Sequence, residues 1–193
     1  SSGLIYPPGS YADTRELIEL ARVVAPFHGI YTSHIRGEGD NLLDSVKETI
    51  AIGEEAQLPV HISHIKVVGQ KNWGRSSEML GLIDEARRRG IDVTADQYPY
   101  PAGSTVLRQA LPPWALEGGT DALALGLEDP SIRQRMRQDI ESNRLSVSFE
   151  VNPGWENMVA SCGLGNIILS YTNHQSDKGF EGKSLSQICR QTG

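Results

Sequence analysis

The amino-acid sequence predicts an α/β fold whose strands run parallel within one sheet. Between residues 13 and 97, helical and strand-like patterns alternate with a step of about 30 residues, which is the length of a strand, a crossover helix and two short loops. Crossovers of this kind are right-handed and join parallel strands. A barrel and a doubly wound open sheet both satisfy this rhythm, so the residues at the strand ends have to distinguish them.

Three helices and three strands are expected in the first half of the chain. The first helix should begin at Asp13 or Thr14, which are good N-cap residues, and end before Gly29. Its apolar side chains recur at helical spacing. The following elements are expected to be a strand over residues 30–35, a helix capped by Asp40 or Asn41, a strand near 59–65, a helix over 76–89 and a strand near 91–97.

Proline and glycine interrupt this rhythm after residue 98. Short helical patterns follow at about residues 120–127 and 130–143, and we interpret residues 101–162 as an insertion. Beyond it, the apolar run over residues 167–171 predicts another strand, and residues 185–191 predict the start of a helix.

Composition excludes several classes of protein. A formal net charge of -6 and an isoelectric point near 5.4 argue against nucleic acids and anionic membranes as partners. The two cysteines, Cys162 and Cys189, lie far apart without a C-x-x-C spacing, which disfavours a disulfide framework and a cysteine-rich zinc site. No apolar run approaches the length of a membrane span, and the N-terminus lacks a secretory-signal pattern. We therefore expect a cytoplasmic protein.

A repeated tetrapeptide marks the carboxyl ends of two predicted strands. Ser33-His34-Ile35-Arg36 and Ser63-His64-Ile65-Lys66 place two histidines 30 residues apart. Because strand side chains alternate, each histidine is expected to continue the inner-facing row of its strand. Imidazoles at the carboxyl ends of adjacent parallel strands can converge on one cation. One such histidine is commonly structural, but two in register favour a shared metal held by His34 and His64.

The neighbouring polar residues receive other roles. His28, His61 and His174 lie outside the repeat and are expected to be structural, with His61 facing the helices. For Glu38 and Asp40, helix capping or pairing with Arg36 is favoured over metal binding. The polar residues 96–98, which end the third predicted strand, are expected to orient the metal ligands or the substrate.

Five segments carry a resemblance to a known family over nearly the whole chain. They are residues 3–9 (GLIYPPG), 31–36 (YTSHIR), 60–66 (VHISHIK), 98–104 (YPYPAGS) and 179–185 (GFEGKSL). In these segments the chain resembles the D-aminoacylase (N-acyl-D-amino-acid deacylase) family of the amidohydrolase superfamily. That family has a (β/α)8 barrel beside a small β-sandwich, with a late insertion in the barrel. The resemblance therefore implies a partial barrel over residues 1–100, an insertion near the active site over 101–162, and a truncated return to the barrel over 163–193.

The resemblance also implies zinc as the cofactor and a set of site residues. His34 and His64 resemble the family's two later zinc ligands, and four residues resemble those that line the pocket and hold the substrate's carboxylate, namely Lys66, Tyr98, Ser104 and Tyr6. The family's early His-x-His pair, its zinc-bound cysteine and its late aspartate have no counterpart in these 193 residues. We therefore expect an internal fragment that contains no catalytic base and does not hydrolyse amides by itself.

The implied reaction is zinc-dependent cleavage of the amide bond of N-acyl-D-amino acids to a carboxylate and a D-amino acid. The alternatives are another enzyme of the superfamily, dihydroorotase-like or prolyl-dipeptidase-like, and a non-catalytic binding domain that has kept the barrel segment. A partial barrel would also leave strand edges unpaired, which favours association between copies of the chain.

Overall fold

The computed structural model describes residues 1–146 and 155–192, and the chain divides into two compact units. The first unit consists of Ser1–Gly103 and Val147–Glu156, and the second of Ser104–Ser146 and Asn157–Gly193. The candidate histidines lie in the first unit.

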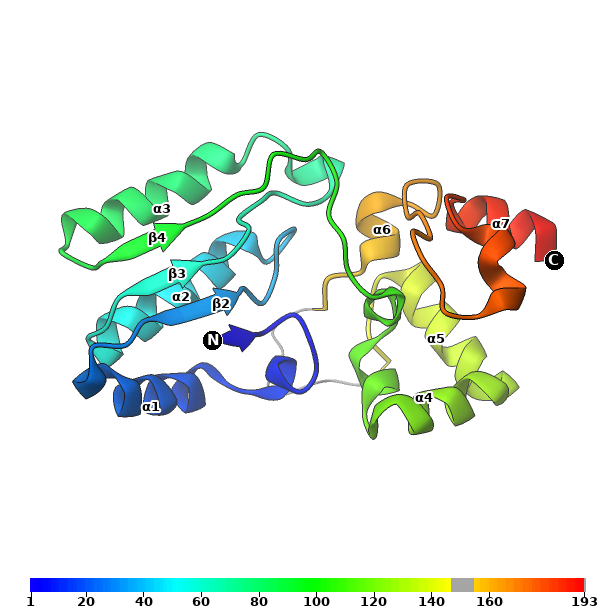
Figure 1. Ribbon diagram of the computed structural model, residues 1–193, viewed down its shortest axis with the longest axis horizontal. Helices are drawn as coiled ribbons and strands as arrows, with labels where there is room; N and C mark the ends of the chain where they lie inside the picture. The colour runs from blue at the N-terminus through cyan, green and yellow to red at the C-terminus, as the bar shows by residue number, and fades with distance from the viewer. Residues whose placement is uncertain (147–154, 193) are drawn as a thin grey trace. The chain divides into compact units, whose positions relative to one another are not determined.

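A four-stranded parallel sheet with the order β1-β2-β3-β4 forms the centre of the first unit (Figure 1). The strands are β1 (Ser2–Gly3), β2 (Tyr31–His34), β3 (Val60–Ile62) and β4 (Val93–Ala95). The helices between them are α1 (Thr14–Val24), α2 (Leu42–Ala56) and α3 (Ser76–Arg88), with short 3-10 helices η1 (Gly9–Tyr11), η2 (Ala25–Phe27) and η3 (Gln70–Asn72). The predicted α/β alternation with parallel strands is therefore confirmed.

Local sequence signals explain where the helices start. The Asp13 side chain accepts a hydrogen bond from the backbone N–H of Glu16 at 2.7 Å and caps α1, as predicted. The N-cap of α2 is Asn41 rather than Asp40. The strands are shorter than their apolar runs, and the two-residue β1 was not predicted, because its length leaves no periodicity to detect.

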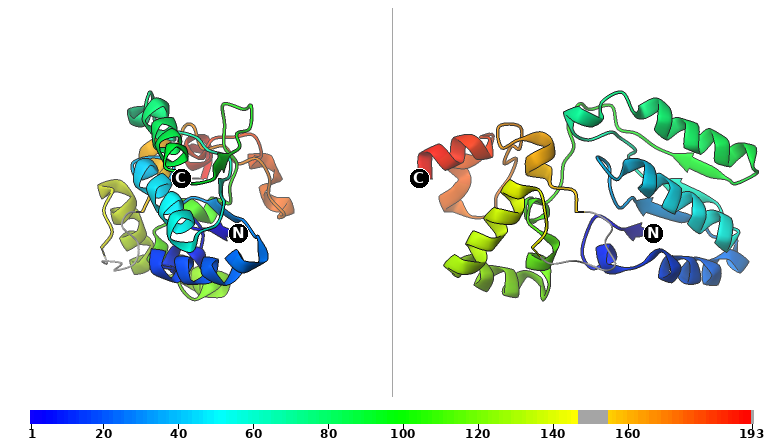
Figure 2. Two further views of the ribbon diagram at one scale, coloured as in Figure 1. Left: turned by 90° about the vertical axis from the view of Figure 1, so that its left-hand side faces the viewer. Right: turned by 180° about the vertical axis from the view of Figure 1, so that it is seen from behind.

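One face of the sheet packs against the three helices, which lie side by side along it (Figures 1 and 2). The core contains buried side chains from the strands and the helices, including Tyr31, Val60, Ile62, Val93, Leu17, Ile18, Val46, Ile50, Met79 and Ile83. Alternate strand positions such as Thr32 and His34 point to the opposite face and are not buried. That opposite face carries the candidate site.

The second unit consists of helices and loops among its described residues. Its elements are η4 (Leu107–Ala110), η5 (Pro113–Leu116), α4 (Gly119–Glu128), α5 (Pro130–Ser142), α6 (Met158–Cys162), η6 (Gln175–Phe180) and α7 (Leu185–Thr192). The three helices predicted for this half of the chain are confirmed as α4, α5 and α7. A small apolar cluster that includes Leu116, Leu123 and Met136 joins η5 to α4 and α5.

The strand predicted over residues 167–171 is wrong. This segment has only an isolated antiparallel bridge, between Ile168 and Ser184. The pairing does not extend into a strand past Ser184 because helix α7 begins at Leu185. The division at residues 101–162 and 163–193 stays a prediction. None of the helices in residues 1–146 and 155–192 has the length and apolar character needed to cross a membrane.

Candidate functional site

The imidazoles of His34, the last residue of β2, and His64, two residues beyond β3, lie against each other. Nδ1 of His34 faces Nε2 of His64, and the ring centroids are 4.5 Å apart. The pKa of His34 is lowered from its ordinary value by partial desolvation and by the neighbouring His64, which favours the neutral imidazole that metals bind. The predicted convergence of these two side chains is therefore present.

The prediction that strand alternation brings the two imidazoles together was wrong. The sheet pairs Ser33 with Ile62, so His64 lies one position further along its strand than the sequence repeat implies. Simple alternation would direct its side chain towards the helices. Instead β3 ends at Ile62, and the backbone of His64 takes a left-handed conformation with φ 43°. This turn returns the imidazole to the side of His34.

Asp96, which follows β4, holds the turn that contains His64. One carboxylate oxygen accepts a hydrogen bond from the backbone N–H of His64, and the other lies 3.6 Å from Nε2 of His61. The hydrogen bond from His64 is the main cause of a lowered pKa for Asp96. His61 does not face the helices as predicted: its Nδ1 contacts Oγ1 of Thr94 at 2.8 Å on the open face, because the register places it opposite that residue.

Glu38 and Lys66 form an ion pair next to His64. Lys66 donates a hydrogen bond to Oε1 of Glu38 and lies 2.9 Å from Nδ1 of His64, and the same Glu38 oxygen is 3.2 Å from that nitrogen. The two side chains are only 19% and 14% exposed for Lys66 and Glu38. Glu38 therefore does not cap a helix, as the sequence favoured, but pairs with Lys66 beside His64.

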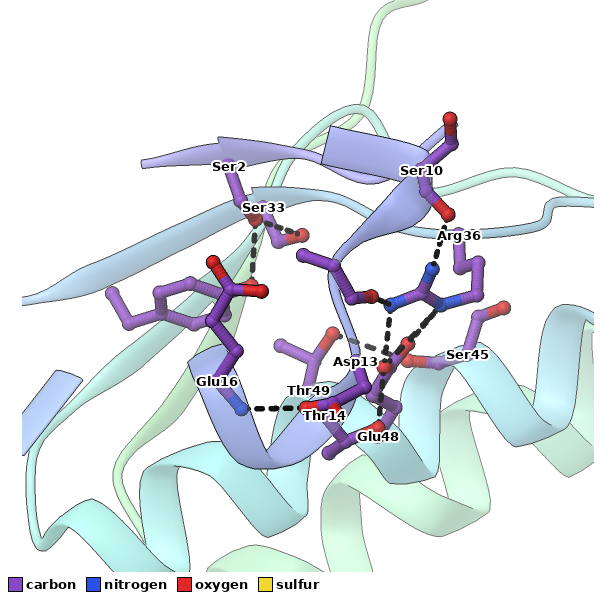
Figure 3. Close-up of polar contacts among 12 residues, drawn as sticks. Ser2, Ser10, Asp13, Thr14, Glu16, Ser33, Arg36, Ser45, Glu48 and Thr49 are labelled. Atoms are coloured by element: carbon purple, nitrogen blue, oxygen red, sulfur yellow. Dashed lines mark hydrogen bonds and ion pairs between the residues drawn. The ribbon is translucent and has the colours of Figure 1, made fainter. Parts of the chain in front are cut away.

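The expected pairing of Glu38 or Asp40 with Arg36 was also wrong. Arg36 instead pairs with Glu48 of α2 (Figure 3), and its buried guanidinium also donates to backbone carbonyl groups before α1. Asp40 accepts hydrogen bonds from Lys71 and Asn72, and these lower the pKa of its carboxyl group.

Aromatic rings flank the histidine pair. The Tyr98 ring centroid lies 6.3 Å from that of His64, and Nζ of Lys66 lies 5.3 Å from the Tyr98 centroid. The Tyr6 ring meets His34 edge-on at 6.3 Å. Burial is the main cause of the raised pKa of Tyr98. Three predicted substrate-binding residues thus surround the histidines, whereas Ser104 is an exposed residue at the start of the second unit.

The arrangement fits one part of a metal site. Facing imidazole nitrogens are suitable ligands for zinc. Among the residues that the structure describes, however, no group of three or more His, Cys, Asp and Glu side chains is arranged to hold a metal ion. A catalytic zinc normally has three protein ligands and a water molecule, so two histidines alone would be an incomplete set.

Comparisons with known proteins support the resemblance. No family model matches the chain. It is 50% identical over 153 residues to a D-aminoacylase of Alcaligenes xylosoxydans xylosoxydans, covering 79% of this chain and 31% of that protein. A solved D-aminoacylase structure, described for its binuclear metal centre, is 44% identical with a TM-score of 0.50 and covers 52% of this chain and 21% of that one.

A second solved structure covers nearly the whole chain. It is an N-acyl-D-glutamate deacylase from Bordetella bronchiseptica, complexed with zinc and a phosphonate inhibitor. It is 27% identical, has a TM-score of 0.64 and covers 97% of this chain and 29% of that one. The chain thus spans less than a third of the length of these relatives.

Proposed function

This chain is homologous to the D-aminoacylases and N-acyl-D-amino-acid deacylases over part of their length, and on that premise we propose that it is part of a zinc-dependent hydrolase of the same class. The substrate is an N-acyl-D-amino acid, and the products are a carboxylate and a free D-amino acid. The observation that carries this proposal is the contact between the imidazoles of His34 and His64 at the carboxyl ends of adjacent parallel strands.

The fold proposal follows the same premise. Residues 1–100 are part of a (β/α)8 barrel, 101–162 are an insertion near the active site, and 163–193 return to the barrel. The four parallel strands with helices on one face support this assignment, since barrel enzymes place their active sites at the carboxyl ends of the strands. The histidines lie at that end of β2 and β3.

Each site residue has a defined task. His34 and His64 would hold the zinc, and Asp96 fixes the turn that orients His64. When bound, zinc lowers the pKa of a water molecule and polarises the acyl carbonyl of the substrate. The remaining ligands and the general base come from parts of the longer protein outside residues 1–193.

The substrate's carboxylate is bound by Lys66, with Tyr98, Tyr6 and Ser104 as further pocket residues. A lysine that is only 19% exposed can bind a carboxylate strongly, because little water competes for the ammonium group. The Glu38 carboxylate orients Lys66 before substrate arrives. The Tyr98 ring beside the ammonium group adds a cation–π contact.

An assay with paired enantiomers tests the proposed reaction. The longer protein, loaded with zinc, is expected to release amino acid from N-acetyl-D-amino acids and not from their L-enantiomers. A chelator should abolish this activity and added zinc should restore it, whereas the 193-residue chain alone should show no turnover. Zinc-dependent cleavage of cyclic amides or of dipeptides in place of N-acyl-D-amino acids would contradict the assignment.

Replacing Lys66 with methionine should raise KM for the N-acyl-D-amino acid by about 10–100-fold, since a hydrogen bond to a charged group is worth about 1.5–3 kcal/mol. The value of kcat should change less, because Lys66 acts on the carboxylate and not on the scissile bond. Lys71→Met is the matched control: Lys71 also pairs with a carboxylate of the same loop, but its side chain is 58% exposed. Equal KM values for the two variants would refute the assignment of Lys66.

A further inference from the structure

The carboxylate of Glu156 is hydrogen-bonded into the backbone of the loop between β2 and α2. Its Oε2 accepts from the N–H of Glu38 at 2.8 Å, and its Oε1 accepts from those of Gly39 at 2.6 Å and Asn41 at 3.3 Å. Glu156 follows Glu38 by 118 residues in the sequence. Successive backbone N–H groups that converge on one anion form a nest, and here the protein supplies the anion itself.

The loop is shaped closely around this carboxylate. A Cβ atom on Gly37 would lie 2.7 Å from Oε1 of Glu156, and one on Gly39 would lie 3.2 Å from the carbonyl oxygen of Val68. Burial raises the pKa of Glu156, and the three backbone hydrogen bonds act in the opposite direction. A carboxylate that is desolvated to this extent is costly unless it is bonded, so the loop and Glu156 stabilise each other.

The loop residue held in this way is the one that contacts the site. The carbonyl oxygen of Glu38 accepts a hydrogen bond from the N–H of Val68 at 2.7 Å, and its own N–H is bound by Glu156. Both backbone groups of Glu38 are therefore engaged. Its side chain extends to Lys66 and His64.

We propose that Glu156 is a positioning residue for the site formed by His34, His64 and Lys66. It fixes the backbone of residues 37–41, and the fixed backbone directs the Glu38 carboxylate onto Lys66 and the His64 imidazole. The role of this site in zinc and substrate binding rests on the function proposed above. The effect of Glu156 on the position of Glu38 can be measured without any enzyme turnover.

The test compares Glu156→Ala and Glu156→Gln with Asp139→Asn in the 193-residue chain. Asp139 is a matched control in the second unit: it is 3% exposed and accepts hydrogen bonds from Nε1 of Trp114 at 2.7 Å and from the N–H of Ser146 at 3.0 Å. Nuclear magnetic resonance reports the exchange of the Glu38 and Gly39 amides and the imidazole signals of His64. Calorimetry reports zinc affinity.

Glu156→Ala should speed exchange of both loop amides by about tenfold or more, since hydrogen bonds to charged acceptors are worth about 1.5–3 kcal/mol. It should also shift the His64 imidazole signals and weaken zinc binding by about 10–100-fold, the usual range for residues that orient ligands. In Glu156→Gln we expect the amide oxygen at the Oε1 position, which accepts two of the three hydrogen bonds, and the NH2 group at the Oε2 position. The Gly39 amide should then stay protected while the Glu38 amide does not, and the His64 signals should shift by an intermediate amount.

Unchanged Glu38 exchange and His64 signals in both Glu156 variants would overturn the proposal, as would equal changes in Asp139→Asn. If Glu156→Ala does not fold, the contrast between the Glu38 and Gly39 amides in Glu156→Gln decides the question. Absence of zinc binding by the unsubstituted chain would count against the preformed metal site of the proposed function, and the amide and imidazole signals would still decide the role of Glu156.

Discussion

Replacing Arg36 with alanine is expected to lower the free energy of unfolding by about 3–5 kcal/mol, the usual result of removing one partner from a buried ion pair. Nη2 of Arg36 lies 2.9 Å from Oε1 of Glu48, and the two side chains are 5% and 11% exposed. Without the guanidinium, Glu48 would remain as a nearly buried and uncompensated carboxylate. Most of the lost stability comes from the unpaired Glu48 carboxylate, and less comes from the lost attraction between the two side chains.

The ion pair of Arg36 and Glu48 connects four segments of the first unit (Figure 3). Its guanidinium also donates to the carbonyl oxygens of Ser10 at 3.2 Å and Ala12 at 2.9 Å, while Oγ1 of Thr14 donates to Glu48 at 2.7 Å. These contacts join the segment before α1, the start of α1, the loop after β2 and the middle of α2. We therefore expect the loss to affect the whole unit rather than one loop.

Chemical denaturation of the chain measures this effect. Arg22→Ala is the control, because Arg22 pairs with Glu19 at 2.6 Å but the side chains are 47% and 60% exposed, and such pairs contribute about 0–1 kcal/mol. A double variant, Arg36→Met with Glu48→Leu, should recover part of the lost stability because it leaves no unpaired charge. A loss in Arg36→Ala no larger than in Arg22→Ala would show that the pair is not buried in solution.

The helices could be predicted because their signals are local. The capping carboxylate of Asp13 and the apolar spacing that follows it lie within one segment, and Asp129 before Pro130 marks the start of α5 in the same way. The repeat indicates that both histidines lie at strand ends, although the contact between them depends on the left-handed turn at His64, which the repeat does not predict. The chemistry of a residue and its position along an element are both contained in a short stretch of sequence.

The features that were missed depend on contacts between distant segments. The one-residue offset between β2 and β3 is set by packing of Val60 and Ile62 against the helices, and it places His61 on the open face. The sequence favours the nearest carboxylates, Glu38 and Asp40, as partners of Arg36, but in the folded unit Arg36 pairs with Glu48, twelve residues away. No local pattern links Glu156 to a loop more than a hundred residues earlier.

Removal of either imidazole is expected to abolish zinc binding by the chain. The unsubstituted chain offers two facing nitrogens and should bind zinc weakly. His34→Ala and His64→Ala should each weaken binding by more than about 100-fold, because even residues that only orient ligands contribute about 10–100-fold. Titration calorimetry with zinc chloride measures all three proteins. The loss should be the same in both variants, since each leaves a single imidazole.

His61→Ala separates this expectation from a general effect of losing a histidine near the sheet end. His61 contacts Thr94 and lies 3.6 Å from Asp96, and it has no part in the facing pair. Its removal should therefore weaken zinc binding much less than the loss of about 100-fold or more expected for His34→Ala and His64→Ala. Zinc binding that survives in His64→Ala but disappears in His61→Ala would move the metal site to the His61 side of the open face. It would also show that the left-handed turn at His64 serves the backbone rather than a ligand.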